Sequence, residues 1–281
     1  MPTVTNSLAA LHWYVDMGVD EAIGEVALDR FASRPAAVVR PATPEGPAFA
    51  PAPRPPRGIE RLELPSPPPR AATVVPLVSG AAQDATRLAA AARDLAELES
   101  ALRAFDGCVL KHTATNLVFG DGNPKAKVML VGEAPGADED RAGKPFVGVS
   151  GQLLDRMLAF IGLDRSTFYI TNQVYWRPPG NRKPTDAEVA ACQPFVMRHI
   201  ELVSPALLLM VGGAATKTLL GRTEGIMKLR GRWFEYGSPG LPQPIPAMAI
   251  FHPAFLLRTP AFKRETWRDL LAVRQRLALL Q

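Results

Sequence analysis

The chain has few cysteines and no long apolar run. It contains 2 cysteines among 281 residues, Cys108 and Cys192. So few cysteines exclude a disulfide-rich secreted scaffold and predict a cytoplasmic protein. No apolar run reaches the roughly 18 residues that a membrane span needs, so none is expected. The first residues lack a basic region followed by an apolar core and a cleavage site, so no signal peptide is expected either.

Apolar residues, positive charge and proline are well represented. Hydrophobic residues make up 47% of the sequence, enough to bury a sizeable core. The net charge is +5, a mild excess that suits a polyanionic partner such as nucleic acid. Thirteen of the 28 prolines lie in residues 31–80, and this composition predicts a disordered linker.

The segment before the linker, residues 1–30, predicts a short helix. Its apolar residues share much of one helical face: Leu8, Leu11, Trp13, Tyr14 and Met17. Such a helix either docks on its own domain or serves as a docking motif for a protein partner, and the pattern leaves both open.

Residues 83–281 predict one α/β domain. A helical pattern at 83–105 is followed by short apolar segments typical of strands, at 127–132, 168–172, 206–211 and 247–251. Helical patterns separate or follow them, at 150–161, 186–202, 214–220 and 263–280. This alternation predicts a three-layer α/β/α fold with a central, mostly parallel four-stranded sheet. Ligands of such sheets bind at the carboxyl ends of the strands.

Polar side chains stand at three of these strand ends. Glu133 follows the first strand, Asn172 ends the second and His252 follows the fourth. An amide matches the acceptor and donor edge of uracil, and an imidazole can stabilise negative charge on a departing base. A carboxylate can orient a water molecule. Each residue also has a plainer reading, as a helix N-terminal acid, a turn residue and a buried histidine respectively.

Three blocks of the sequence resemble family 4 uracil-DNA glycosylases. They are VFGDGNPKAKVMLVGEAPGADEDRAGKPFVGVSGQLLDRML, TNQVYWRPPGNRKPTDAEVAAC and HPAFLLR. The resemblance implies that Glu133 is the catalytic carboxylate and that His252 assists departure of the leaving group. It also implies that Gly132, Phe146 and Asn172 line the uracil pocket, although Phe146 alone would equally suit a core position.

The resemblance implies an activity and a partner. The enzyme would flip uracil out of DNA and hydrolyse its N-glycosidic bond, leaving an abasic site for base excision repair. We expect a monomer that acts on uracil-containing DNA. Two alternatives stay open. One is a non-catalytic uracil- or DNA-binding module tethered to another repair protein. The other is an enzyme of free nucleotides, for which the sequence lacks a phosphate-binding glycine motif.

Basic residues near the motifs predict contacts with DNA phosphates. They form two clusters and one further position: Arg177, Arg182 and Lys183; Lys228, Arg230 and Arg232; and Arg258. Solvated loops are the alternative explanation for the two clusters. Leu256 or Leu257 is a candidate wedge for the gap that a flipped base leaves, and core positions would explain both leucines as well.

The chain departs from the family pattern in its cysteines. The resemblance implies four thiolate ligands of a [4Fe-4S] cluster, but two of the four positions hold Phe105 and Trp176. Only Cys108 and Cys192 remain, so no cofactor is expected. We expect hydrophobic packing in place of the cluster, although His112 or His199 could join the cysteines in a different metal site.

Overall fold

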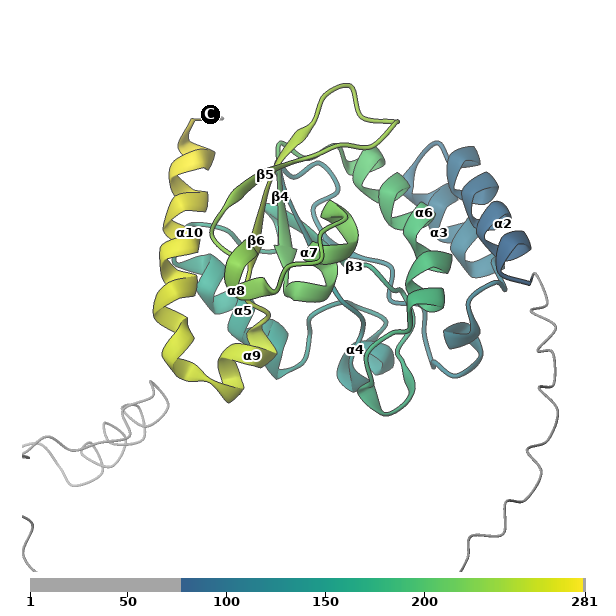
Figure 1. Ribbon diagram of the computed structural model, residues 1–281, viewed down its shortest axis with the longest axis horizontal. Coiled ribbons are helices and arrows are strands. Elements are labelled where there is room, and N and C mark those ends of the chain that lie inside the picture. Colours follow the sequence, from purple (N-terminus) through teal and green to yellow (C-terminus); the bar gives the residue numbers. More distant parts are fainter. Residues whose placement is uncertain (1–76, 280–281) are drawn as a thin grey trace, which may run out of the picture. The chain divides into compact units, whose positions relative to one another are not determined.

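Helices and strands alternate along residues 77–279, the part of the chain that the computed structural model describes (Figure 1). The helix predicted in residues 1–30 lies outside this part, as does most of the linker predicted for 31–80. Helix α2 (Leu77–Ala91) already includes residues 77–80, which corrects the end of that linker. No proline follows Pro76 until Pro124, so every backbone amide in this stretch can bond within a helix.

The helix predicted at residues 83–105 is two helices. Helix α2 ends at Ala91, and α3 (Leu95–Ala104) begins after a short break. The Asp94 carboxylate accepts a hydrogen bond from the Glu97 backbone N–H at 2.8 Å and caps the second helix. The prediction followed the composition of the whole stretch and overlooked this cap, which is a common start signal for a helix.

A six-stranded sheet in the order β1-β3-β2-β4-β6-β5 forms the centre of the domain. The four inner strands are parallel and correspond to the four predicted strands: β2 (Val128–Gly132), β3 (Phe168–Asn172), β4 (Leu207–Val211) and β6 (Ile245–Ile250). Two short antiparallel strands flank them, β1 (Asp121–Gly122) and β5 (Trp233–Tyr236). The prediction missed these edge strands because one has only two residues and the other is largely exposed.

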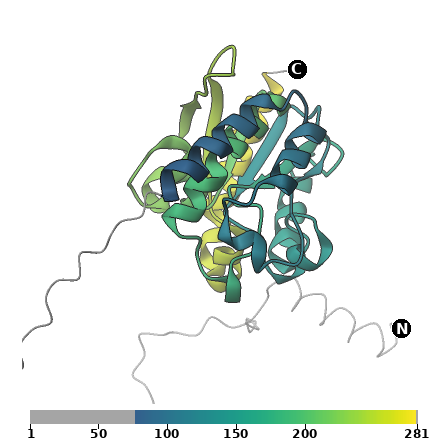
Figure 2. The ribbon, with the colours of Figure 1, turned by 90° about the vertical axis from the view of Figure 1, so that its right-hand side faces the viewer.

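Helices cover both faces of the sheet, as the three-layer prediction requires (Figures 1 and 2). Residues of α3 and α6 (Asp186–Val203) share one buried cluster with Met129 and Leu208. Residues of α5 (Val149–Ala159) and α10 (Lys263–Ala278) share another with Leu130 and Leu209. Neighbouring residues of one strand thus face opposite layers, because side chains alternate across a sheet.

The remaining helices are short. They are α4 (Ala137–Ala142), α7 (Gly213–Leu220), α8 (Ile226–Leu229), α9 (Pro253–Arg258) and the 3-10 turns Val109–His112, Pro179–Asn181 and Pro260–Phe262. Within residues 77–279, each helix is too short or too polar to span a membrane. The inner strands β2, β3 and β4 are buried along their whole length. Polar side chains that could meet a ligand are therefore expected at or just after the ends of these strands.

Candidate active site

A cavity of about 520 Å³ lies at the carboxyl ends of β2, β3 and β6. We call it the strand-end pocket. It brings together many of the predicted site residues: Glu133, Phe146, Asn172, Arg182, Lys183, His252 and Arg258. Other predicted positions do not line it: Gly132, Arg177, Lys228, Arg230, Arg232 and Leu257.

Gly132 lets two pocket side chains approach the end of β2. It pairs with Asn172 across the β2–β3 ladder. A Cβ atom on Gly132 would lie 2.4 Å from the Asn172 Oδ1 atom and 2.5 Å from the Phe146 Cζ atom. Any other residue at 132 would therefore displace the amide or the ring. Gly132 does not itself line the strand-end pocket, but its lack of a side chain leaves room for two residues that do.

Asn172 carries a buried polar atom that has no hydrogen-bond partner within residues 77–279. Its side chain is only 2% exposed, and among the described residues its Oδ1 atom accepts no hydrogen bond. A buried acceptor left unpaired costs roughly 1–3 kcal/mol. A ligand donor that entered the strand-end pocket would remove this cost. The arrangement favours a ligand role for Asn172 over that of a simple turn residue.

Phe146 sits on a turn that Glu139 stabilises. The Glu139 carboxylate accepts hydrogen bonds from the backbone N–H groups of Val147 and Gly148, at 3.0 and 2.9 Å, and from that of Gly136 at 3.1 Å. From the sequence, one of the acids Asp138, Glu139 and Asp140 is expected to hold this loop by bonding backbone amides, and Glu139 does so. Its spacing of three residues after Gly136, at the start of α4, was the available signal, because it is the spacing of a capping box.

His252 has its tautomer set by the backbone. It caps α9, and its Nδ1 atom accepts a hydrogen bond from the Ala254 N–H at 3.1 Å. The neutral ring therefore carries its proton on Nε2. Burial lowers the pKa of His252 to about 4, and Arg258 acts in the same direction. At neutral pH, His252 is a neutral hydrogen-bond donor.

Phe146 and Gly212 both lie close to His252. The Phe146 ring lies 5.8 Å from the His252 ring, centroid to centroid. Gly212, at the end of β4, has a φ of 96°, and a Cβ atom there would lie 3.0 Å from the His252 Cβ atom. Glycine at 212 both permits this backbone conformation and leaves room for the histidine.

Glu133 is a half-buried carboxylate at the mouth of β2. Burial raises the pKa of Glu133, and the charge of Lys183 opposes that shift. The backbone carbonyl of Glu133 accepts a hydrogen bond from Val174 N–H at 3.2 Å, which ties the residue to the segment after β3. A carboxylate whose pKa is displaced by its surroundings and which lines a cavity is a candidate for acid–base or electrostatic catalysis.

The loop at residues 178–184 forms another wall of the strand-end pocket. Arg182 forms two hydrogen bonds with the buried Glu188 carboxylate, at 2.6 and 2.8 Å, and so anchors the loop to α6. Lys183 is also exposed and lines the pocket, but Arg182 is already committed to Glu188. Arg177 bonds Asn181 Oδ1 through its Nε atom at 2.7 Å. Lys183 is thus the loop cation best suited to meet a phosphate.

Arg230 differs from its predicted role as a phosphate contact. Its guanidinium forms an ion pair with Asp269 of α10 and donates to the Glu265 carbonyl at 2.7 Å. It also lies over the Phe251 ring, 5.3 Å from the centroid. These contacts make Arg230 a link between α8 and α10, because its charge is already neutralised inside the domain.

The two leucines of α9 differ in their exposure to solvent. Leu256 is fully buried, whereas Leu257 is 40% exposed. Arg258 follows on the same helix and lines the strand-end pocket. Of the two wedge candidates, only Leu257 can reach a ligand, and Leu256 belongs to the core.

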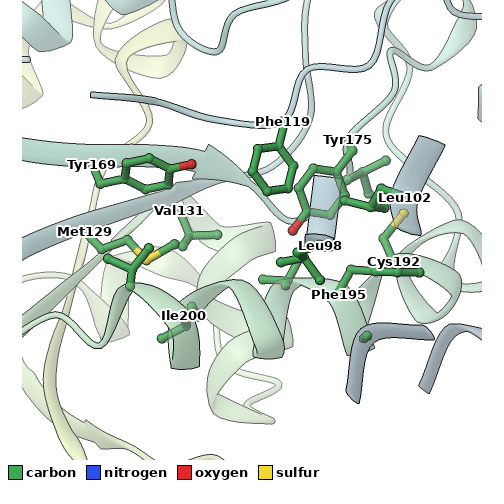
Figure 3. Packing of buried hydrophobic residues seen from close by; sticks show 14 of the residues in the cluster. Leu98, Leu102, Phe119, Met129, Val131, Tyr169, Tyr175, Cys192, Phe195 and Ile200 are labelled. Carbon is green, nitrogen blue, oxygen red and sulfur yellow. The ribbon is translucent and has the colours of Figure 1, made fainter. Parts of the chain in front are cut away.

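Phe105, Cys108, Trp176 and Cys192 are all buried, in what we call the two-cysteine core. The Sγ atoms of the two cysteines lie 3.9 Å apart, and Phe105 packs on Phe195 with ring centroids 5.1 Å apart. Figure 3 shows Cys192 among apolar side chains. Two thiols and two aromatic rings do not fit a [4Fe-4S] cluster, which needs four ligands.

The two histidines considered for a different metal site have other surroundings in residues 77–279. Both ring nitrogens of His199 bond tyrosine hydroxyls, at 3.1 Å to Tyr175 and 3.0 Å to Tyr169. Burial lowers the pKa of His199 to about 3. His112 is exposed. Across residues 77–279, no group of three or more potential ligands among His, Cys, Asp and Glu lies close enough to hold a metal ion.

Known proteins resemble this chain over the same region. A family model described as the uracil DNA glycosylase superfamily matches residues 119–271. A Type-4 uracil-DNA glycosylase of Pyrobaculum aerophilum is 38% identical over 181 residues, which cover 63% of this chain and 91% of that protein. The enzyme of the same name from Archaeoglobus fulgidus is 41% identical over 166 residues, covering 58% of this chain and 82% of that protein.

Proposed function

The chain belongs to the uracil DNA glycosylase superfamily, and on this premise we propose that it removes uracil from DNA by hydrolysis. It is a monofunctional N-glycosylase of base excision repair. The observation that carries this proposal is the strand-end pocket, where Glu133, Asn172 and His252 converge with the Phe146 ring. A base in duplex DNA reaches such a pocket only when it is flipped out of the helix.

Recognition of uracil rests on Asn172 and Phe146. The unpaired Asn172 Oδ1 atom is an acceptor for the uracil N3–H group, and the side-chain amide is a donor for the O4 atom. Phe146 offers a flat apolar surface on which a base can stack. Cytosine presents an amino group in place of O4 and an unprotonated N3, so the same amide would face it with mismatched groups.

Hydrolysis breaks the bond between the deoxyribose C1′ atom and uracil N1, with the bonding electrons leaving on the base. Positive charge develops on the sugar, and Glu133 stabilises it and orients the attacking water. The His252 Nε2–H group donates to the departing uracil oxygen. Water adds to C1′ and loses a proton, and uracil takes one up. The atoms therefore balance without a covalent enzyme intermediate.

DNA contacts surround the strand-end pocket. Lys183 and Arg258 line it, and Arg177 immediately precedes the loop that contains Lys183. These cations bind phosphates flanking the flipped nucleotide, while Leu257 fills the gap in the base stack. Lys228 and Arg232 are exposed and supply more distant phosphate contacts.

We also propose that the chain works without an iron–sulfur cluster. The support is the donor set, because buried phenyl and indole rings replace two of the four thiolates that the family resemblance implies. The neighbouring Cys108 thiol and burial raise the pKa of Cys192 well above its usual value, so this residue is a protonated thiol. A monomeric state, a cytoplasmic location and a protein partner for residues 1–30 are further proposals that rest on sequence alone.

A uracil-containing oligonucleotide tests the function. Wild-type protein incubated with single- and double-stranded forms should release free uracil and leave alkali-labile abasic sites. It should not cut the strand itself. Strand cleavage without alkali would contradict the monofunctional assignment. Tight binding of the oligonucleotide with no uracil release would instead support the alternative of a non-catalytic DNA-binding module.

A further inference from the structure

The turn that carries Phe146 has an unusual backbone. Phe146 has a φ of 56°, in the left-handed region that residues other than glycine rarely adopt. Its ring nevertheless occupies a defined place, against Gly132 and 5.8 Å from the His252 ring between centroids. A conformation of this kind persists only where surrounding contacts determine it. The question is which contacts do so here.

Arg165 holds the carbonyl side of this turn. Its Nη2 atom donates to the Phe146 carbonyl at 2.7 Å, and its Nη1 atom donates to the Pro145 carbonyl at 3.2 Å. Glu139 holds the next two amides, as described above. The turn is therefore fixed between a cation that donates to its carbonyl groups and an anion that accepts from its N–H groups.

Arg165 is itself held in place. Its Nε and Nη2 atoms bond the Asp155 carboxylate at 3.0 and 3.2 Å, and its Nη1 atom bonds Asp121 at 3.2 Å. Its guanidinium lies 5.5 Å from the centroid of the Phe168 ring. Only arginine offers five donors in one rigid plane, so lysine could not make all of these bonds at once.

Arg165 does not line the strand-end pocket, so it can influence a ligand only through the residues that it orients. We propose that Arg165 is a positioning residue that fixes the Phe146 ring as the stacking surface for uracil. The proposal rests on the function proposed above and adds a residue that lies outside the pocket, between α5 and β3.

The chain offers a matched control for this residue. Arg198 of α6 is exposed to the same extent as Arg165, 26% against 25%. It also pairs with a carboxylate, Glu201, and donates to a backbone carbonyl, that of Ala92, at 2.8 Å. It lies outside the strand-end pocket. Arg165→Met and Arg198→Met therefore remove bonds of the same kinds, five in the first and three in the second, but only the first loosens the Phe146 turn.

Hydrogen exchange tests the positioning claim without reference to activity. In Arg165→Met, the amides of Val147 and Gly148 should exchange faster than in wild type, while Arg198→Met should leave them unchanged. Unchanged exchange in Arg165→Met would overturn the proposal. This readout holds even if the wild-type protein releases no uracil, in which case the proposed function fails and the positioning claim is still decided.

Kinetics test the consequence for uracil. Arg165→Met should weaken inhibition by free uracil and lower kcat/KM by roughly tenfold to a hundredfold, because small displacements of a positioning group have effects of this size. In a Phe146→Leu background, the same change should cost less than about threefold, because the group that Arg165 orients is gone. Equal losses in both backgrounds would overturn the proposal.

Arg165→Lys covers the case in which Arg165→Met does not fold. It keeps a charge beside Asp155 and Asp121 but cannot bridge both carbonyl groups. Its uracil affinity should be reduced, with wild-type stability largely retained. Wild-type affinity for uracil in Arg165→Lys would contradict the proposal that the Arg165 guanidinium positions Phe146 by bonding both carbonyl groups.

Discussion

The strand-end pocket and the two-cysteine core are both built from positions where the sequence can be compared with family 4 enzymes. They differ in the kind of side chain that they bury. The pocket holds polar groups in energetically unfavourable surroundings. The Asn172 Oδ1 atom has no partner among the described residues, and burial raises the pKa of Glu133 and lowers that of His252. The core buries Phe105 and Trp176, two apolar rings at the positions where the resemblance implies ligands.

This difference separates two kinds of constraint. Unsatisfied polar groups are costly and persist where a ligand or a reaction needs them. Positions that serve only stability can exchange one means of support for another, provided that volume and burial are kept. On this account the pocket preserves chemistry, while the core exchanges metal ligation for packing.

Restoring the two missing cysteines should give the largest effect. Phe105→Cys with Trp176→Cys truncates two buried rings, and each truncation costs about 3–5 kcal/mol. Because domains are stable by only about 5–15 kcal/mol, the double variant without iron should be largely unfolded, as measured by circular dichroism during denaturation. If assembled with iron, it should regain stability and turn brown.

An exposed pair of the same residue types provides the control. Phe160 and Trp267 are 68% and 40% exposed, and their rings meet edge to face at 5.9 Å. Phe160→Cys with Trp267→Cys should change stability far less. Similar stability of the two double variants would contradict the packing account of the core.

Replacing the pocket carboxylate should affect rate and spare affinity. Glu133→Gln keeps the shape of the side chain but removes its charge, so the single-turnover rate should fall by about 10²–10⁴. Affinity for uracil-containing DNA should change only a few-fold. Asp138→Asn is the control, because this exposed acid of α4 pairs with Arg141 and lies outside the pocket. A near-native rate for Glu133→Gln would remove its assigned role.

Changing the amide that faces uracil should affect selection. Asn172→Asp replaces the side-chain donor with a second acceptor, to which the cytosine amino group can donate. The ratio of single-turnover rates on uracil and cytosine should fall by about 10- to 100-fold. Asn181→Asp, on the loop across the pocket, should leave this ratio unchanged. If Asn172→Asp also leaves it unchanged, Asn172 does not select the base.

The smallest effect concerns salt. Neutralising a phosphate contact should shallow the dependence of log affinity on log salt concentration by about 0.7–0.9 per contact. Lys183→Gln should show this change. Arg230→Gln should not, because Arg230 pairs with Asp269, and it should instead lower the stability of the domain. If Arg230→Gln shallowed the salt dependence and Lys183→Gln did not, Arg230 would be a phosphate contact and Lys183 would not.

The inner part of the fold could be predicted from sequence because its signals are local. Each inner strand is a short apolar run, and Glu133, Asn172 and His252 mark three of the ends. The edge strands carry no such signal. Strand β1 has only two residues, and its pairing with Tyr169 and Ile170 depends on tertiary structure.

The interaction partners of charged residues were harder to predict from the sequence than the inner strands. The sequence shows a cluster of cations around Arg230 but not the Asp269 carboxylate that reaches it from α10, 39 positions later. Likewise, nothing near Arg165 in the sequence reveals that it bonds the carbonyl groups of Pro145 and Phe146. Such contacts depend on how helices and loops pack, which composition and periodicity do not specify.

Metal content and uracil release, measured on one anaerobic preparation of the wild-type protein, test the central claim most directly. The account predicts a colourless protein that releases uracil from a uracil-containing oligonucleotide and carries neither iron nor zinc in stoichiometric amount. Stoichiometric metal, with uracil release that rises and falls with metal content across preparations, would contradict it.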